Sequence, residues 1–92
     1  MCAKKQTDGR GRAGRVWQSE EGGLFFSIYL RPEFAADKAS MLTVVMAVAV
    51  AKAIHTYLAE YASTDMRDKC SIAIKWPNDV IFNKKKVVGI LT

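Results

Sequence analysis

The sequence is poor in the residues that build disulfide frameworks and metal sites. It contains two cysteines, one histidine and two prolines among 92 residues. Cys2 and Cys70 lie far apart and lack the spacing of metal ligands, and the first residues do not form an export signal. Free thiols in a cytoplasmic protein are therefore the expected state, in preference to a disulfide-stabilised secreted domain.

A long hydrophobic run is also missing. The apolar run at residues 44–51 is shorter than the roughly 20 residues that cross a bilayer, and Lys52 interrupts its continuation. We therefore expect no membrane-spanning segment and no membrane partner. Half of the residues are hydrophobic and a quarter are charged, as in ordinary soluble domains. The length allows at most one domain with a small core.

The positive charge is concentrated in two short stretches. The net charge of the chain is +5. The first 15 residues carry five basic side chains against Asp8, and residues 84–86 are three consecutive lysines. This local concentration favours an anionic ligand over a uniformly basic surface, with nucleic acid as the first alternative.

Hydrophobic patterns predict an α+β protein with one long helix. Residues 6–14 hold three glycines without hydrophobic periodicity and should form a mobile loop. Residues 24–30 (LFFSIYL) should form a strand that is buried on both faces. Residues 37–61 show helical spacing and should form one largely buried helix capped by Asp37 or Ser40.

The last third of the chain alternates in strand fashion around short connections. Residues 63–69 are polar and should form a loop. Strands are expected at residues 71–76, 80–82 and 87–91, with a hairpin turn in residues 83–86 because asparagine tolerates turn dihedrals. The predicted order is strand, loop, strand, helix and three strands, with largely antiparallel pairing.

The first segment with functional chemistry is residues 6–17 (QTDGRGRAGRVW). Its glycines allow close approach of the backbone to a ligand, and its arginines present planar forks that match carboxylates and phosphates. A solvated basic loop or an arginine-glycine nucleic-acid tract explains the same residues. The literal match to a glycine-rich nucleotide fingerprint carries little weight, because no helical pattern follows it.

Two further segments follow the helix. In residues 75–79 (KWPND), proline fixes the backbone so that polar side chains are held at a strand end, although a plain turn explains the same residues. In residues 84–91 (KKKVVGIL), a solvated hairpin tip or an edge-strand guard is the default interpretation of the lysines. Gly89 within a strand indicates close approach of a ligand or of another backbone.

The three segments together, in this order, resemble the catalytic domain of the biotin protein ligases, also called biotin–acetyl-CoA-carboxylase ligases. GRGRxGRxW, KWPNDV and KxxGIL carry the resemblance, which runs through nearly all of the chain. GRGRxGR together with KWPND is highly specific. The resemblance implies part of a class II aminoacyl-tRNA synthetase/biotin ligase-like domain. Residues 1–92 are then expected to be its central part, incomplete at both ends.

The resemblance implies an ATP-dependent enzyme. The carboxylate of biotin attacks the α-phosphate of ATP to give biotinyl-5′-adenylate and pyrophosphate. A lysine of the biotin carboxyl carrier protein then attacks the mixed anhydride. Biotin and ATP are thus the expected small-molecule partners and Mg²⁺ accompanies ATP. DNA is a partner only if the parent protein carries an additional repressor domain, and the expected location is the cytoplasm.

The resemblance also implies roles for single residues. The expected catalytic residues are Arg12 and Lys86, whose charges offset the repulsion between two anionic reactants. Those expected to bind biotin are Gln6, Gly9, Arg10, Gly11, Arg12 and Lys86. Those expected to bind ATP and Mg²⁺ are Arg12, Asn78, Asp79 and Lys86, with Asp79 as the metal ligand because a hard cation prefers oxygen. Those expected at the pocket floor or in the core are Trp17 and Trp76.

The sequence departs from the family pattern in two respects. Asp8 stands where alanine is usual, and it can pair with a neighbouring arginine. The upstream Ser-Thr-Asn segment and the downstream glycine-rich strands of the family do not occur in this sequence. Two rival interpretations remain, a nucleic-acid-binding module without enzymatic activity and a lipoate ligase of the same broader fold. The pair of GRGRxGR and KWPND favours biotin over lipoate.

The isolated chain of 92 residues is expected neither to catalyse the reaction nor to unfold cooperatively. Half a sheet cannot bury its inner face, and its unpaired strand edges are exposed. Scanning calorimetry of this chain should therefore show a broad transition or none. A sharp two-state transition would overturn the expectation.

Overall fold

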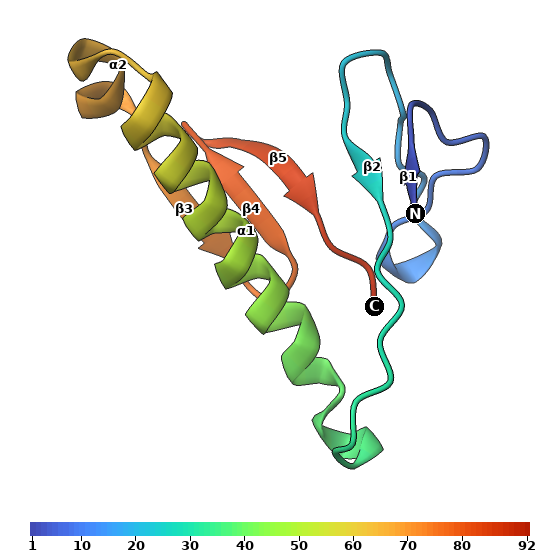
Figure 1. Cartoon of the computed structure of the whole chain (residues 1–92). Coiled ribbons are helices and arrows are strands. Elements are labelled where there is room, and N and C mark those ends of the chain that lie inside the picture. The colour runs from blue at the N-terminus through green and yellow to red at the C-terminus, as the bar shows by residue number, and fades with distance from the viewer. The chain divides into compact units, whose positions relative to one another are not determined.

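The structure, a computed structural model, describes all residues from Met1 to Thr92 and divides into two compact units, Met1–Phe34 and Ala35–Thr92. Each unit contains its own antiparallel sheet, and the second also contains one long helix (Figure 1). The predicted α+β class with one long helix is therefore confirmed. The class II synthetase-like architecture stays a prediction.

The first unit is held by a two-stranded sheet. β1 (Cys2–Ala3) pairs antiparallel with β2 (Phe25–Phe26). The pairing extends by one residue, because the Met1 amino group donates to the Ser27 carbonyl at 2.9 Å and the Ser27 amide donates to the Met1 carbonyl at 2.8 Å. The residues between these two strands form one long connection outside the sheet.

The predicted strand at residues 24–30 is wrong in length and in burial. Only two of these residues form a regular strand, and Leu24, Phe26 and Tyr29 are exposed. Aromatic and branched residues form a strand only where a partner strand pairs with them, and β1 offers two residues. Within this unit no α-helix or second sheet covers the strand, so the aromatic side chains stay exposed.

The second unit begins with a short 3-10 helix, η2 (Ala36–Lys38), which leads into the helix α1 (Ser40–Tyr61). Ala39 occupies the N-cap position of α1 and no side chain caps it, so the prediction of Asp37 or Ser40 as the cap is wrong. The N–H of Ala39 bonds back to η2 at 3.1 Å. Backbone carbonyls rather than a side chain therefore accept the first amides.

Helix α1 packs on the sheet through a narrow stripe. Among its residues only Thr43 and Ala47 are buried, whereas Val45, Tyr57 and Tyr61 are exposed. The prediction of a largely buried helix is therefore wrong. A sheet on one side covers one face of a helix, and a helix that is apolar on several faces leaves the others in solvent.

The helical segment Ala36–Tyr61 is long and apolar enough to cross a membrane by length and composition alone. The sequence-based exclusion of a span considered only the uninterrupted run at residues 44–51. Core helices of soluble proteins meet the same criterion, and α1 packs against β3 (Ile72–Lys75) and β4 (Asp79–Phe82). The packing identifies α1 as the helix that covers this sheet.

Residues 63–69, predicted to be a loop, contain a second helix, α2 (Thr64–Lys69). Ser63 is its N-cap, because its side-chain oxygen accepts the Met66 amide at 3.3 Å. Lys69 pairs with Asp65 one turn away at 3.0 Å. A serine cap with an acidic residue in the first turn favours a helix start. A polar segment can therefore be helical without an apolar face.

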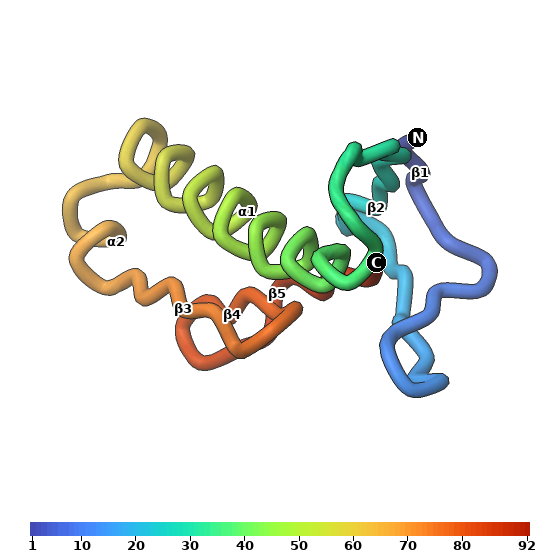
Figure 2. Tube along the Cα trace, turned by 90° about the horizontal axis from the view of Figure 1, so that it is seen from below, coloured from blue at the N-terminus to red at the C-terminus, as the bar shows by residue number.

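The three strands that were predicted at the end of the chain are present, but the last one spans residues 85–89 rather than 87–91. β3, β4 and β5 (Lys85–Gly89) form an antiparallel sheet in sequence order. Figure 2 shows α1 lying along one face of this sheet. Ile74 of β3 and Val88 of β5 both lie opposite Val80 in the middle strand. These three residues therefore share one face of the sheet.

The core lies between that face and α1. Val80 on β4 and Ala47 on α1 are fully buried, and they are the two buried hydrophobic residues of the chain. The hydroxyls of Thr43 and Thr92 are 2.6 Å apart, which ties the residues after β5 to the first turns of α1. Because this core is small, the sheet is held together mainly by its backbone hydrogen bonds.

The connection between β4 and β5 is a two-residue turn. Phe82 pairs with Lys85, and Asn83 and Lys84 between them have φ values of 47° and 67°. Two positive φ angles define the mirror-image turn that matches the twist of a hairpin. The side-chain oxygen of Asn83 accepts the Ser71 amide at 2.8 Å. The predicted hairpin turn with Asn83 is confirmed and narrowed to two residues.

Lys84 occupies a backbone conformation that glycine adopts without steric cost. Lys84→Gly should therefore stabilise the hairpin by about 1 kcal/mol. Lys85→Gly is the matched control, because it removes the same side chain from an extended strand and should destabilise the hairpin. Amide hydrogen exchange along β4 and β5 should slow in the first variant and accelerate in the second. The same direction of change in both variants would contradict this account.

Candidate functional site

The arginine-glycine segment folds into an ordered turn within the first unit. Arg10 and Val16 form an antiparallel bridge at its base, and the Gly11 amide donates to the Arg15 carbonyl at 2.7 Å. The prediction of a loop is confirmed, and these bonds give the loop a defined backbone path. The arginines are therefore presented from a shaped turn rather than from a featureless linker.

The tip of this turn is a second 3-10 segment, η1 (Arg12–Gly14). Ala13 and Gly14 reverse the chain there with φ values of 57° and 72°. Glycine takes such angles at no steric cost. Arg12 and Arg15 are exposed at the two ends of the tip. Two planar guanidinium groups are thereby available to an anion in solvent.

Gly9 is buried at the base of the turn, where a side chain has no room. The Trp17 amide donates to the Gly9 carbonyl at 2.8 Å. A methyl group on Gly9 would collide with the Trp17 carbonyl oxygen and come within 3.0 Å of Gln6 Oε1. The Ser19 hydroxyl donates to this Oε1 at 3.0 Å. The structure therefore places two predicted biotin-binding residues, Gln6 and Gly9, side by side.

Arg10 is already paired with a carboxylate. Its Nε and Nη2 atoms both donate to Asp8 Oδ2, at 3.0 Å and 2.6 Å. The predicted pairing of Asp8 with a neighbouring arginine is thus confirmed. The two side chains are 73% and 72% exposed, so the pair contributes about 1 kcal/mol or less to stability. A ligand that binds the Arg10 guanidinium must therefore displace the Asp8 carboxylate.

The two tryptophans predicted for the pocket floor lie in different surroundings. Trp17 is half-buried and lines an open depression together with Val16 and Gln18. Trp76 is 74% exposed, so it does not pack in the core of the second unit. It stands in the turn that leads from β3 to β4, and its peptide bond to Pro77 is cis.

Asn78 is fixed at the entrance to β4 by the residues after β5. Its side-chain N–H donates to the Ile90 carbonyl at 3.3 Å, and its own carbonyl accepts the Ile90 amide at 2.9 Å. Asn78 and Asp79 are both half-buried. The KWPND segment is therefore a turn that also holds polar side chains in fixed positions. The turn is therefore confirmed, and the role of this segment as a ligand site stays a prediction.

An ion pair joins Asp79 in β4 to Lys86 in β5. Lys86 Nζ lies 2.8 Å from Asp79 Oδ1, with the lysine side chain 40% exposed and the aspartate 14% exposed. Oδ1 is shielded from solvent, and the ammonium approaches it outside the angular range of a hydrogen bond, so the contact is one of opposite charges. A shielded carboxylate is costly without a cation nearby, and Lys86 provides that cation.

The residues around Asp79 do not fit a Mg²⁺ ion held by protein side chains alone. No group of three or more His, Cys, Asp or Glu side chains gathers anywhere in the chain. The shielded oxygen of Asp79 faces an ammonium, which takes the place that a cation would need. Mg²⁺ requires about six oxygen ligands. The assignment of Asp79 as a metal ligand stays a prediction.

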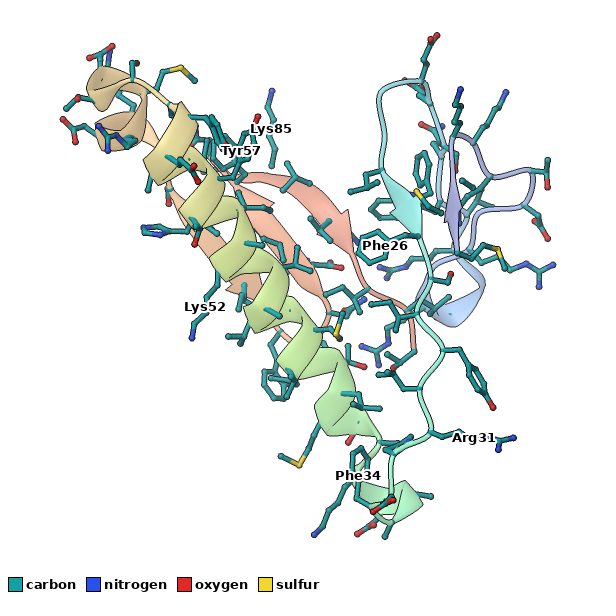
Figure 3. All side chains as sticks on the ribbon, in the orientation of Figure 1. Phe26, Arg31, Phe34, Lys52, Tyr57 and Lys85 are labelled. Atoms are coloured by element: carbon teal, nitrogen blue, oxygen red, sulfur yellow. The ribbon has the colours of Figure 1, made fainter.

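The predicted site residues are divided between the two units. The first unit contains Gln6, Gly9, Arg10, Gly11, Arg12 and Trp17, and the second contains Trp76, Asn78, Asp79 and Lys86. Within the units the structure brings Gln6 next to Gly9 and Asp79 next to Lys86. Convergence of the arginines and Lys86 on one ligand stays a prediction. All side chains are drawn in Figure 3.

Comparison with known proteins identifies the class to which these features belong. Residues 1–92 match the biotin/lipoate A/B protein ligase family. The chain is a member of that family. The resemblance drawn from the three sequence segments is thereby confirmed over the whole length of the chain.

Individual relatives make the comparison more specific. The bifunctional ligase/repressor BirA of Bacillus spizizenii is 48% identical over 100% of this chain and 26% of its own length. A biotin–[acetyl-CoA-carboxylase] ligase of Paracoccus denitrificans is 39% identical over 99% of this chain and 35% of its own length. The chain thus spans about a quarter of the length of the Bacillus relative. No solved structure matches it.

Two glycines of the arginine-glycine turn differ in the room that the structure leaves for a side chain. Gly9→Ala should disrupt the turn by roughly 1–3 kcal/mol, because the new methyl group meets backbone and side-chain atoms that cannot retreat freely. Gly11→Ala is the matched control, because its methyl group would lie at an ordinary 3.5 Å from Arg15. The Trp17 amide resonance reports the bond to Gly9 and should shift in the first variant alone. A large shift in both variants would contradict the assignment.

Proposed function

We propose that this chain forms part of an ATP-dependent biotin protein ligase. In the first step, a carboxylate oxygen of biotin attacks the α-phosphorus of ATP, the bond to the bridging oxygen breaks and pyrophosphate leaves. In the second step, the amine of a lysine on the biotin carboxyl carrier protein attacks the carbonyl of the mixed anhydride. The amine loses a proton, an amide forms and AMP leaves. The proposed location of the protein is the cytoplasm.

The observation that carries the proposal is the similarity of the entire chain to proteins named as biotin ligases. The family description covers biotin and lipoate ligases alike. The Paracoccus relative is named as a biotin ligase acting on acetyl-CoA carboxylase. GRGRxGR at residues 9–15 and KWPND at residues 75–79 add weight on the same side. Biotin is therefore the substrate that we propose.

Arg12 and Lys86 are the proposed catalytic residues. Both reactants of the first step are anions, and Coulomb repulsion opposes their approach. Arg12 is exposed at the tip of its turn, and the Lys86 side chain is 40% exposed, so an anion can reach either group. Two cations beside the attacking carboxylate and the α-phosphate offset that repulsion and stabilise the charge that develops in the transition state.

The neutral end of biotin needs positioned hydrogen-bond partners rather than charge. Gln6 and Arg10 are proposed to contact its ureido ring, and Gly9 and Gly11 to let the backbone approach the ligand closely. The contact between Gln6 and Ser19 supports this proposal, because it orients the Gln6 amide before any ligand arrives. Arg10 would leave Asp8 to join the ligand.

ATP is proposed to enter with Mg²⁺, which neutralises charge on the phosphate oxygens when it is bound. Asn78 is proposed to face the phosphates. The rigidity of Asn78 supports this role, because two hydrogen bonds to Ile90 hold the residue at the entrance to β4. A polar side chain that is fixed before binding loses little conformational entropy when the ligand arrives.

A nucleic-acid-binding module is the second candidate function. The exposed basic residues near the start of the chain and at residues 84–86 favour it. Such a module predicts a steep fall in affinity with rising salt and no preference for biotin. The Bacillus relative is named as a repressor as well as a ligase, and this name describes that relative alone. For this protein, DNA binding through an additional domain is a separate proposal.

Biotin-dependent exchange of pyrophosphate into ATP tests the proposed function in the full-length protein. We expect exchange that requires biotin, followed by transfer to a carrier protein when one is added. Lipoate in place of biotin should give little exchange. Absence of exchange with either acid, together with salt-sensitive binding of RNA or DNA, would replace the ligase proposal with the nucleic-acid one.

Arg12→Ala should weaken retention of the biotinyl-adenylate more than it weakens folding. A charge-assisted hydrogen bond contributes roughly 1.5–3 kcal/mol, so release should accelerate about ten- to a hundredfold. Thermal unfolding should change little because Arg12 is exposed. Arg31→Ala is the matched control, since Arg31 is an exposed arginine of the same unit that bonds to Tyr29. Adenylate release measured in the full-length protein decides the matter, and an unchanged rate would count against the role of Arg12.

A further inference from the structure

The contact between Asp79 and Lys86 requires an irregularity in the sheet. Asp79 pairs with Gly89 and Val80 with Val88, but Ile81 pairs with Lys86. The register therefore shifts by one residue between Val80 and Ile81, and Val87 is the unpaired residue on β5. An extra residue on one strand is a β-bulge, which redirects side chains next to it.

The bulge allows Lys86 and Val88 to face opposite sides of the sheet. In a regular strand, residues two positions apart point to the same side. Val88 lies opposite Val80, whose side chain is fully buried on the α1 side. Without the extra residue, either Lys86 would point toward the helix or Val88 would leave the core.

With the bulge, Lys86 is directed to the side of Asp79. It lies opposite Ile81, which is two residues from Asp79 on β4 and therefore shares its face. Diagonal neighbours on one face are within reach of a long side chain. The observed separation of 2.8 Å between the charged groups agrees with this placement.

We infer that Asp79 is a positioning residue that holds the Lys86 ammonium for the anions of the reaction. The inference rests on the proposed function, in which Lys86 meets the biotin carboxylate and the α-phosphate. The Asp79 side chain is 14% exposed, so the carboxylate is a fixed point, while Lys86 at 40% keeps access to solvent. An ammonium has three N–H donors. The carboxylate sets the position of the group, and the exposure of the lysine side chain gives an anion access to it from solvent.

Positioning and simple charge predict opposite effects for Asp79→Asn. The substitution removes a negative charge beside Lys86, so charge alone predicts tighter binding of anionic substrates. Positioning predicts that the ammonium loses its fixed location and that chemistry slows. In the full-length protein we expect kcat for adenylate formation to fall roughly a hundredfold, because a small misplacement of a reacting partner has that effect. The KM values for biotin and ATP should not rise.

A double-variant cycle tests whether Asp79 acts through Lys86. Asp79→Asn should cost nothing further when Lys86→Gln is already present. Additive losses, or a loss that excess Mg²⁺ restores, would overturn the inference in favour of an independent metal-binding role. Asp65→Asn is the matched control, because it removes the exposed carboxylate of another lysine pair and should leave kcat unchanged.

A measurement on the unaltered protein guards against a variant that fails to fold. Nuclear magnetic resonance of the lysine ammonium groups should show Lys86 ordered before biotin or ATP is added, in contrast to the exposed Lys84 and Lys85. A Lys86 group as mobile as those two would overturn the inference. Absence of biotin-dependent exchange in the unaltered protein would instead refute the proposed function, so the two failures are distinguishable.

Discussion

The backbone hydrogen bonds between β4 and β5 determine which side of the sheet each of their side chains occupies. The two-residue turn at Asn83 and Lys84 sets the register from one end, and the bulge at Val87 shifts it before the strands separate. Val80 can then be buried under α1 while Asp79 on the same strand meets Lys86. The same backbone hydrogen bonds between β4 and β5 therefore position both the buried Val80 and the pair of Asp79 and Lys86.

The two units hold their predicted site residues in different ways. The first unit has almost no core, and its turn is shaped by backbone bonds around the buried Gly9. Such a turn can rearrange at little cost, because few apolar contacts would be broken. In the second unit, Asn78 and Asp79 belong to a sheet and its connections, and their positions are fixed by pairing. The predicted site residues of the first unit therefore belong to a turn that can rearrange, and those of the second unit belong to a sheet that holds them in place.

Local patterns in the sequence predicted much of the second unit. The alternation of hydrophobic and polar residues predicted the three strands, and Asn83 predicted the turn, because these features depend on neighbours along the chain. Burial was predicted poorly. The aromatic run around Phe26 and the outer faces of α1 are apolar, but exposure depends on whether another element covers them. That information is absent from the periodicity of a single segment.

The candidate site was predictable to a similar extent. The resemblance to the biotin protein ligases selected Gln6, Gly9, Asp79 and Lys86, and the structure places Gln6 beside Gly9 and Asp79 beside Lys86. The sequence did not predict the contact between Asp79 and Lys86, because this contact depends on a register shift that no residue type indicates. The helix after Ser63 was missed for a different reason. Its signal is a cap and an acidic first turn, which a search for hydrophobic period overlooks.

The pair of Asp8 and Arg10 gives the arginine-glycine turn an internal counter-ion, and this affects how the proposed ligand binding at Arg10 would respond to ionic strength. Added salt screens attraction between exposed charges, including that between a guanidinium and an incoming ligand. It also loosens the pair that the ligand must displace, whose partners are 73% and 72% exposed. The two effects oppose each other, so recognition at Arg10 should be less sensitive to salt than recognition by a bare arginine. The proposed binding of a ligand at Arg10 would therefore vary little over a range of ionic strengths.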